Sequence, residues 1–161
     1  MNIESVPDGF LPVNVGGDFA SYNGPFYARW HEAHLQLGFV VTERRINPGK
    51  ACHGGMLSLF ADIMLSLAAQ YQTDIERQFL PTISLQTDFM ASAPLGQWVQ
   101  GQADILKVTR KLIFSQGLIS CNGTVVVRAS GVFRRGPLLP DTESDGLLQL
   151  PGMPTRPRSP G

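Results

Sequence analysis

The stretch that decides the fold is His53-Gly-Gly-Met-Leu-Ser-Leu-Phe-Ala-Asp-Ile-Met-Leu-Ser-Leu-Ala-Ala-Gln-Tyr-Gln72, a run without a proline. It is rich in Ala, Leu and Met, which are strong helix formers, so it predicts one long helix. The apolar residues fall on nearly every side of that helix, and a helix of this kind must be covered all round. A curved sheet can cover one side, and a second copy of the chain is the simplest cover for the other.

Strand patterns lie on both sides of this helix in the sequence. Six segments have them: residues 25–30, 35–46, 82–91, 97–109, 111–121 and 124–135. The dipeptide Asn122-Gly123 between the last two is a strong signal for a two-residue hairpin turn. One helix with several long antiparallel strands predicts an α+β domain in which the sheet wraps around the helix.

The last strand pattern alternates along its length. One face holds Val125, Val127, Ala129, Gly131 and Phe133. The opposite face holds Thr124, Arg128, Ser130 and Arg134. This alternation is typical of an antiparallel strand with one buried face.

The two ends of the chain differ from the body in composition. The first 24 residues are rich in Gly, Asn, Asp and Pro, so we expect a loose arm over 1–24. From Gly136 the chain is rich in proline, so we expect residues 136–161 to be extended, and either disordered or draped over a neighbour. Residues 25–135 then form the folded domain.

The charge balance limits the partners of the chain. Lys plus Arg and Asp plus Glu number 13 each among 161 residues, which argues against nucleic acid or an anionic membrane as the main partner. The first eleven residues lack the pattern of a signal peptide, and two cysteines are too few for a disulfide framework. The apolar run 56–71 contains Asp62 and is shorter than the ~20 residues of a membrane span. We therefore expect a cytoplasmic location.

Asp62 is the first candidate for chemistry, because it is the only charged residue between His53 and Gln72. Burying an isolated carboxylate is costly, so such a group is paired, protonated or functional. Ser58, Asp62 and Ser66 are spaced by four and share one stripe of the helix. Asp62 is a candidate general base or nucleophile. The alternative is a structural Asp that is hydrogen-bonded to Ser58 or Ser66.

His53-Gly54-Gly55 lies where the helix begins. Two glycines allow close approach of a ligand and leave N–H groups at the positive end of the helix, which suits a developing oxyanion. Asn47 could aim its amide at the same place. The alternatives are a flexible junction at the glycines and an ordinary turn at Asn47.

Taken together, these residues resemble a known family. Asn47-Pro-Gly-Lys-Ala-Cys-His53-Gly54-Gly55-Met56, followed by Leu59-Phe-Ala-Asp62, is similar to the Asn…Gly…His-Gly-Gly…Ala-Asp signature of hotdog-fold acyl-CoA thioesterases. The subgroup is the one that contains the phenylacetic-acid-pathway thioesterase, and the wider superfamily includes 4-hydroxybenzoyl-CoA thioesterase. The strand from Thr82 to Met90 matches the strand that follows the helix there, and the resemblance covers about residues 25–135.

The resemblance implies a fold, an assembly and residue roles. Members of the family have the hotdog fold, form dimers or tetramers, and place the active site between two subunits. By resemblance, Asp62 is the base or nucleophile and the N–H of Gly54 polarises the thioester carbonyl. Asn47 and His53 orient the reactants or the loop, and Thr82 is a helper hydroxyl. Gly55 would lie against the ligand, and coenzyme A is part of the substrate, so no separate cofactor is expected.

One departure concerns the basic residues at the start of the fifth strand of the domain. Many relatives carry a Gly between them, whereas this chain has Lys107-Val-Thr-Arg110-Lys111. Arg110 and Lys111 could still bind coenzyme A phosphates, or they could form an exposed basic turn. The same two interpretations apply to Arg134 and Arg135.

Other candidates carry less chemistry. His31 and His34 are three residues apart, but no further His or Cys completes a metal set, so no metal site is expected. Cys52 precedes the motif, but free Cys is more often a small buried apolar residue than a nucleophile. Ser58 and Ser66 lack the strand–turn–helix context of serine hydrolases.

The sequence therefore predicts a homo-oligomeric enzyme that hydrolyses acyl-CoA thioesters through Asp62. Two rivals remain. One is a hotdog hydratase or dehydratase, for which a different His-containing motif would be usual. The other is a non-catalytic module that binds acyl-CoA or an acyl carrier, against which the intact Asp62 argues.

Overall fold

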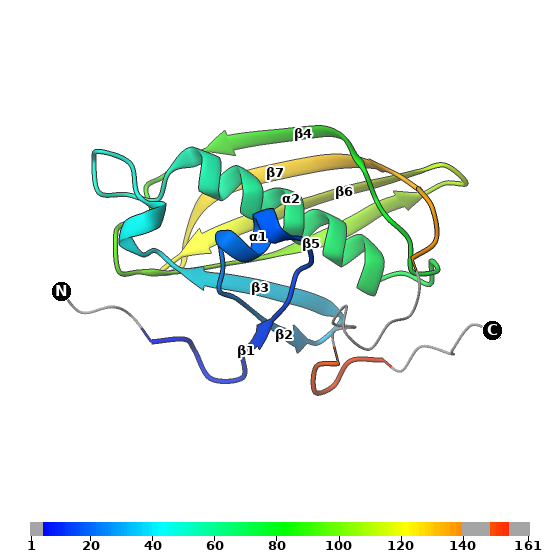
Figure 1. Cartoon of the computed structure of the whole chain (residues 1–161), viewed down its shortest axis with the longest axis horizontal. Helices are drawn as coiled ribbons and strands as arrows, with labels where there is room; N and C mark the ends of the chain where they lie inside the picture. The colour runs from blue at the N-terminus through cyan, green and yellow to red at the C-terminus, as the bar shows by residue number, and fades with distance from the viewer. Residues whose placement is uncertain (1–4, 140–148, 155–161) are drawn as a thin grey trace.

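The computed structural model of the chain describes residues 5–139 and 149–154 and contains one antiparallel sheet with a long helix across it (Figure 1). The seven strands are ordered β1-β2-β3-β5-β6-β7-β4. Their bounds are β1 Leu11–Val13, β2 Phe26–His31, β3 His34–Val40, β4 Thr82–Phe89, β5 Trp98–Val108, β6 Leu112–Cys121 and β7 Thr124–Arg134. The helices are α1 Asp18–Tyr22, η1 Glu43–Arg45 and α2 Gly54–Tyr71. This is the hotdog fold, and the predicted α+β class is confirmed.

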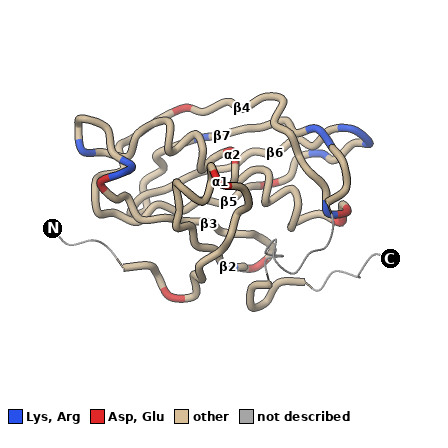
Figure 2. The backbone as a smooth tube through the Cα atoms, viewed as in Figure 1, with Lys and Arg blue, Asp and Glu red and all other residues tan. Residues whose placement is uncertain are grey.

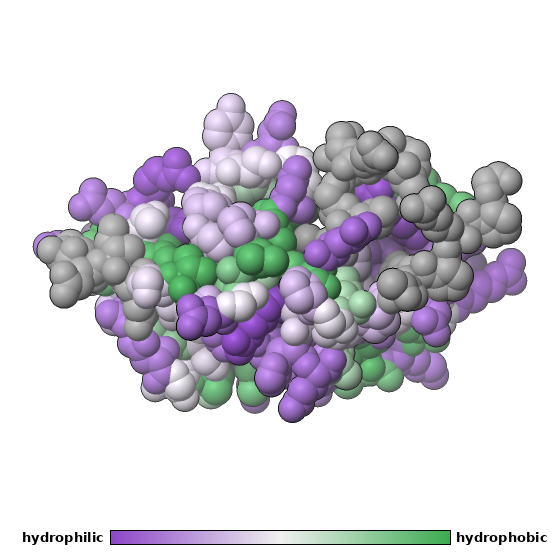
Figure 3. All heavy atoms as spheres, turned by 90° about the horizontal axis from the view of Figure 1, so that it is seen from below, coloured by the Kyte–Doolittle hydropathy of each residue, from purple (hydrophilic) through white to green (hydrophobic). Residues whose placement is uncertain are grey.

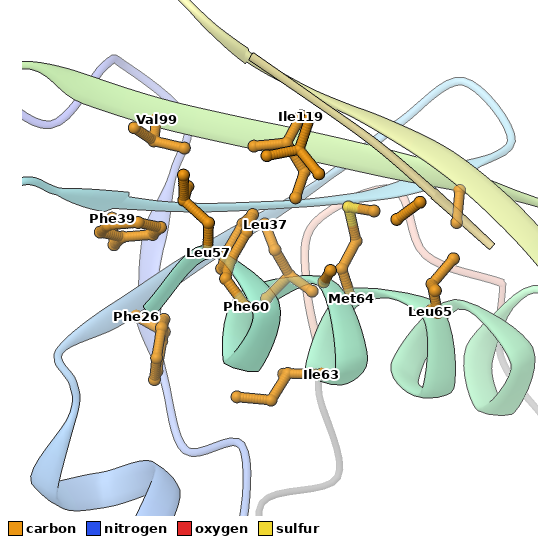
Figure 4. Packing of buried hydrophobic residues seen from close by; sticks show 14 of the residues in the cluster. Phe26, Leu37, Phe39, Leu57, Phe60, Ile63, Met64, Leu65, Val99 and Ile119 are labelled. Atoms are coloured by element: carbon orange, nitrogen blue, oxygen red, sulfur yellow. The ribbon is translucent and has the colours of Figure 1, made fainter. Parts of the chain in front are cut away.

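The long helix α2 forms where the sequence predicts it. His53 is its N-cap, and the His53 side chain accepts a hydrogen bond from the Gly55 N–H. The helix packs against β3, β5, β6, β7 and β4. Leu57, Phe60 and Met64 point from α2 toward the sheet, where Val99 and Ile119 lie, whereas Ile63 points to the opposite side (Figure 4). The apolar side chains on this face of α2 are therefore buried by the sheet of the same chain.

Three glycines on neighbouring strands let α2 lie close to the sheet. A Cβ at Gly101 would lie 2.5 Å from the sulfur of Met64, and one at Gly117 would lie 2.9 Å from the Met64 methyl carbon. A Cβ at Gly131 on the next strand would lie 3.1 Å from a methyl carbon of Leu65. Side chains at these positions would push the helix away from the sheet.

The expectation of a loose N-terminal arm is wrong for the part of it that the structure describes; residues 1–4 lie outside that part. β1 pairs with β2, and α1 follows it. Phe10 is buried against Trp98, with the two rings edge to face at 4.9 Å between centroids. Composition alone pointed to a loop, but Phe10 and Ala20 have apolar partners far away in the sequence.

Two strands differ in detail from their predictions. The strand expected over 35–46 ends at Val40, and the single turn η1 follows it. In β7 the pairing passes from Val127↔Ile119 to Val125↔Ser120, so Val126 is an extra residue in a β-bulge and is fully buried. The alternation predicted for this strand therefore holds from Val127 onward, whereas Val126 adds a buried side chain.

The C-terminal segment also departs from its prediction. The chain beyond β7 first pairs with the segment after α2, where the Phe79 N–H donates to the Pro137 carbonyl at 2.9 Å. Leu150 is then buried in the main core with 7% of its surface exposed, so residues 149–154 pack on their own chain. Residues 140–148 and 155–161, on which the rest of that expectation falls, lie outside the described residues.

No helix within the described parts of the chain is long and apolar enough to span a membrane.

Candidate active site

Asp62 lies in the middle of α2 and is half-buried. Its Oδ1 accepts a hydrogen bond of 2.6 Å from the hydroxyl of Thr82, at the first position of β4. The two residues are twenty positions apart in the chain and come together because β4 runs along α2. This hydrogen bond fixes the orientation of the carboxylate.

The pair lies on the wall of an open pocket with a volume of about 360 Å³. The pocket is lined by Phe19, Gly55, Ser58, Leu59, Asp62, Thr82 and Leu85. Ser58 is part of this lining, as the stripe of polar residues on the helix predicts. Ser66 donates its hydroxyl hydrogen bond to the backbone carbonyl of Ile63, one turn back in the same helix. The polar partner of Asp62 is thus a residue of β4, and neither serine has that role.

The start of α2 is arranged differently from the prediction of several free N–H groups. The Gly55 N–H donates to His53 Nδ1 at 2.8 Å, so the histidine side chain already satisfies it. The N–H groups of Met56 and Leu57 both donate to the His53 carbonyl. Gly54, the first residue of the helix, is therefore the position whose N–H remains for an oxyanion, and His53 is a helix cap with an exposed ring.

Asn47 has the geometry of a turn residue. Its side-chain oxygen accepts hydrogen bonds from the Gly49 N–H at 3.0 Å and the Ala51 N–H at 3.2 Å. These bonds hold the loop that leads into α2, and Asn47 is absent from the lining of the Asp62 pocket. Of the two interpretations of Asn47, the local geometry favours the turn.

Gly54 and Asp62 are separated along one helix by eight residues. At 1.5 Å per residue this is roughly 12 Å along the helix axis. A reacting carbonyl must lie about 3 Å from its oxyanion donor and either touch the carboxylate or be separated from it by one water molecule, which is a much shorter span. Both groups of a single chain therefore cannot serve one carbonyl. A complete site needs a donor other than Gly54 of the same chain.

The candidate phosphate-binding residues lie at one end of the sheet. Arg110 and Lys111 are exposed in the turn between β5 and β6, where Thr109 Oγ1 accepts the N–H groups of Lys111 and Leu112. Arg135 joins this turn through a 3.1 Å hydrogen bond to the Thr109 carbonyl. Lys and Arg gather at this end in Figure 2. The structure thus supplies a basic turn that is held in a defined shape.

Cys52 does not have the surroundings of a nucleophile. The side chain is buried, and burial raises the pKa of its thiol to about 12. Arg45 lies beside it, and burial lowers the pKa of that guanidinium, with a further contribution from Arg44. Arg45 is held by backbone carbonyls, with its Nη1 close to that of Val40 and its Nη2 2.6 Å from that of Asn23. Both residues have structural roles.

The two histidines of the first hairpin face separate carboxylates. His34 Nε2 lies 2.8 Å from Asp104 Oδ1, and His31 Nε2 lies 3.9 Å from Glu32.

The sequence predicts Asp62 and Thr82 and misses three apolar residues of the pocket, of which Leu59 lies on α2 itself. Phe19 comes from the segment that composition assigned to a loose arm, and Leu85 comes from β4. In a regular strand Leu85, three residues after Thr82, would point to the opposite face. The pairing with β7 shifts between Thr82 and Ser84, so β4 has a bulge there and both residues line the pocket. Nothing local marks Phe19, because its place over the pocket depends on how residues 5–24 cross the sheet.

Comparison with known proteins agrees with this geometry. Residues 49–128 match the model of the thioesterase superfamily. A Pseudomonas aeruginosa protein named as a candidate esterase is 29% identical over 130 residues, which cover 80% of this chain and 96% of that protein.

Solved structures have the same fold. A variant of the phenylacetic acid degradation protein PaaI of Thermus thermophilus superposes with a TM-score of 0.63 at 18% identity, covering 74% of this chain and 99% of that one. A hypothetical thioesterase of Streptococcus pneumoniae, solved with coenzyme A, gives a TM-score of 0.64 at 14% identity, covering 74% and 96%. At these identities the structures establish the fold alone. With the sequence matches they lead to one conclusion: this chain belongs to the thioesterase superfamily and has its hotdog fold.

Proposed function

We propose that this protein hydrolyses acyl-CoA thioesters to a free acid and coenzyme A, with Asp62 as the reacting carboxylate. Asp62 either removes a proton from water as the water attacks the thioester carbonyl, or attacks that carbonyl directly. Both routes need an ionised carboxylate in a fixed orientation at the surface of a pocket. The coenzyme A thiolate is a good leaving group, so the reaction needs no strong general acid.

The observation that carries the proposal is the 2.6 Å hydrogen bond from the Thr82 hydroxyl to Asp62 Oδ1 beside an open pocket. It engages one carboxylate oxygen and leaves Oδ2 for water or substrate. A purely structural Asp would be expected to have its oxygens turned toward the backbone or core. Here the carboxylate instead lies among Ser58, Leu59 and Leu85, where a ligand can reach it.

The oxyanion donor in this proposal is the Gly54 N–H of a second copy of the chain. Since Gly54 and Asp62 of one chain are roughly 12 Å apart along α2, one chain alone cannot complete the site. A two-fold dimer has two equivalent sites, because the contact of residue i with residue j is repeated as j with i. Each chain then supplies Asp62 to one site and the Gly54 N–H to the other. The S. pneumoniae relative solved with coenzyme A supports a coenzyme A ester as the substrate class.

Asp62→Asn tests the reacting group. Asn is nearly isosteric but cannot accept the proton from water or form an anhydride, so kcat should fall by at least ~10²–10⁴. The assay is thiol release from short, medium-chain and aromatic acyl-CoA esters, with the melting temperature measured on the same preparation. The matched control is Asp88→Asn, which removes an exposed carboxylate of β4 that pairs with Arg128 at 3.0 Å. A near-wild-type kcat for Asp62→Asn would remove this residue from the mechanism.

Mixing two inactive variants tests the shared site. Gly54→Pro removes the N–H at the first helical position, where proline is well tolerated, and His53 already has the extended backbone that precedes proline. Co-expressed with Asp62→Asn, it should regain about a quarter of wild-type activity, because half of the dimers are mixed and each has one intact site. Gly54→Ala, which keeps the N–H, is the control. Absence of recovery, with both variants folded and dimeric, would contradict a site built from two copies.

A further inference from the structure

Helix α1 is drawn in front of α2 in Figure 1, and its residue Phe19 lines one pocket with Gly55 and Leu59 of α2. It lies outside the segment that matches the family model, residues 49–128. It rests on the core through Ala20, whereas the Phe19 side chain has 72% of its surface exposed. A large aromatic side chain that is left in water contributes little to the stability of its own fold. The exposed position of Phe19 is therefore better explained by a bound ligand that covers its side chain.

Phe19 lines the same pocket as Asp62 and Thr82. Leu59 of α2 and Leu85 of β4 supply further apolar lining. The pocket thus combines a polar part, with the carboxylate and the hydroxyl, and an apolar part made by three separate elements. An acyl group attached to a reacting carbonyl has this same division, with a polar centre and a hydrocarbon that gains free energy when it leaves water.

Contacts that do not involve the Phe19 ring hold α1 in this place. At the C-terminal end of α1, Arg44 Nη2 donates to the Tyr22 carbonyl at 3.0 Å, and Arg45 donates to the Asn23 carbonyl. Before α1, Gly16 and Gly17 adopt positive φ angles of 85° and 75°, which turn the chain from β1 onto the helix side. Truncation of the Phe19 side chain should therefore leave α1 where it is.

We propose that Phe19 is a specificity-determining residue whose ring contacts the acyl group of the substrate. This inference rests on the proposed thioesterase function and adds a residue to it. The ring extends the apolar wall of Leu59 and Leu85, so acyl groups large enough to reach it gain binding that acetyl does not. Phe19 takes no part in the chemical step, which stays with Asp62 and Thr82.

The test compares kcat/KM for octanoyl-CoA or phenylacetyl-CoA with kcat/KM for acetyl-CoA. In Phe19→Ala this ratio should fall roughly tenfold or more, the usual range for a lost contact in an apolar pocket, with little change for acetyl-CoA. Phe19→Leu should fall between wild type and Phe19→Ala. Tyr22→Ala is the matched control, because Tyr22 is on the same helix, is 80% exposed and is absent from the pocket lining. Its ratio should equal that of wild type.

The outcomes separate the two proposals. Wild-type activity with the same ratio in Phe19→Ala and Tyr22→Ala would overturn the role of Phe19 and leave the thioesterase proposal standing. A higher ratio in Phe19→Ala would also overturn it, because the ring would then obstruct the acyl group. A wild-type protein inactive on every ester would overturn both. Melting temperatures equal to wild type, expected for exposed side chains, show that a changed ratio does not come from unfolding.

Discussion

The carboxylate of Asp62 depends on a partner that is distant in the chain. Thr82 Oγ1 donates to it at 2.6 Å, and hydrogen bonds to charged groups are about twice as strong as neutral ones. Because only Oδ1 is engaged by Thr82, the hydroxyl both orients the carboxylate and leaves its second oxygen available. Thr82 is in this way a positioning residue for Asp62, and its effect should appear in the rate.

We expect Thr82→Val to lower kcat, because valine keeps the shape of the side chain and loses the donor. A hydrogen bond to a charged group contributes about 1.5–3 kcal/mol, so the loss is roughly ten- to a hundredfold. Thr82→Ser keeps the hydroxyl and should retain most of the activity. Steady-state kinetics on the three proteins decide the matter, and equal kcat for Val and Ser would show that the hydrogen bond has no role in turnover.

Cys52 should be inert in the folded protein. Burial raises the pKa of its thiol to about 12, above the ordinary value of 9.0, so the thiolate is scarce at neutral pH. The unfolded chain loses this proton first, so the contribution of Cys52 to stability is fully present below pH 9 and is lost as the pH rises toward 12. Iodoacetamide at pH 8 should label Cys52 only after denaturation, as mass spectrometry of the peptide would show. Rapid labelling of the native protein would contradict the buried thiol.

The turn between β5 and β6 holds the side chains of Arg110 and Lys111 at the surface through hydrogen bonds of backbone N–H groups. Thr109 fixes the turn through the N–H groups of Lys111 and Leu112, which leaves the Arg110 and Lys111 side chains exposed. His53 caps the N-terminal end of α2 and is not part of this turn. The basic turn and the start of α2 are thus separate features of the structure.

Charge reversal of Arg110 and Lys111 should raise KM for coenzyme A esters more than it lowers kcat, because a phosphate contact far from the carbonyl is made equally in ground and transition states. Exposed charge pairs contribute about 0.2–1 kcal/mol each, so KM should rise roughly threefold or more for the double variant. The rise should shrink at high salt. Arg128→Gln, which removes a charge that already pairs with Asp88, is the control. An unchanged KM would favour an exposed turn without a ligand.

The return of the C-terminal segment to the body of the domain joins two distant parts of the chain. Leu150 is buried in the core cluster that includes Phe26 and Ala28, and a Cβ on Gly152 would lie 3.9 Å from the Trp30 ring. Residues 149–154 are drawn below β2 in Figure 1. The segment therefore supports β2, and none of residues 149–154 lines the Asp62 pocket.

Leu150→Ala should lower the free energy of unfolding by about 2–5 kcal/mol, the usual cost of a large-to-small change in a core. The kcat of the folded fraction should stay near wild type, because no tail residue in the described part of the chain lines the Asp62 pocket. Gln149→Ala, at an exposed neighbouring position, is the control. Chemical denaturation of both variants measures the difference, and equal stability would show that the segment is only loosely attached.

The surface of a single chain leaves apolar groups uncovered. The edge strand β4 pairs with β7 on one side, and Ile83, Phe89 and Met90 on it or just after it are more than half exposed. Figure 3 shows a further apolar patch in the middle of the face seen from below. A long edge strand with exposed apolar residues is a template for pairing with another chain.

We expect the protein to be a homo-oligomer at micromolar concentration, built on two-fold dimers. Pairing along β4 would cover these side chains and bring two copies of α2 together, as the shared site requires. Sedimentation velocity across a dilution series measures the assembly. A stable monomer at micromolar concentration would contradict both the oligomer and the two-copy site.

Much of the fold follows from local patterns. Helix α2 follows from its proline-free run of helix-forming residues, and the strands β4–β7 follow from their strand patterns. Pro94 and Gly96 separate β4 from β5, and Asn122-Gly123 joins β6 to β7. Asp62 is marked by its isolation, because a charge among apolar residues is costly wherever the helix packs. These features depend on residues close together in the chain, so the sequence can indicate them.

Other features depend on contacts between distant segments, and no local pattern contains them. The composition of residues 5–24 predicted a loose arm, but Phe10 packs against Trp98 and Phe19 of α1 lines the pocket.

The sequence alone was thus enough to predict the helix, the sheet and the carboxylate. The hydrogen bond between Thr82 and that carboxylate, the place of Phe19 in the pocket lining and the burial of Leu150 depend on the way the sheet brings distant segments together. Such contacts are selected by the packing of the whole chain and not by neighbours in sequence.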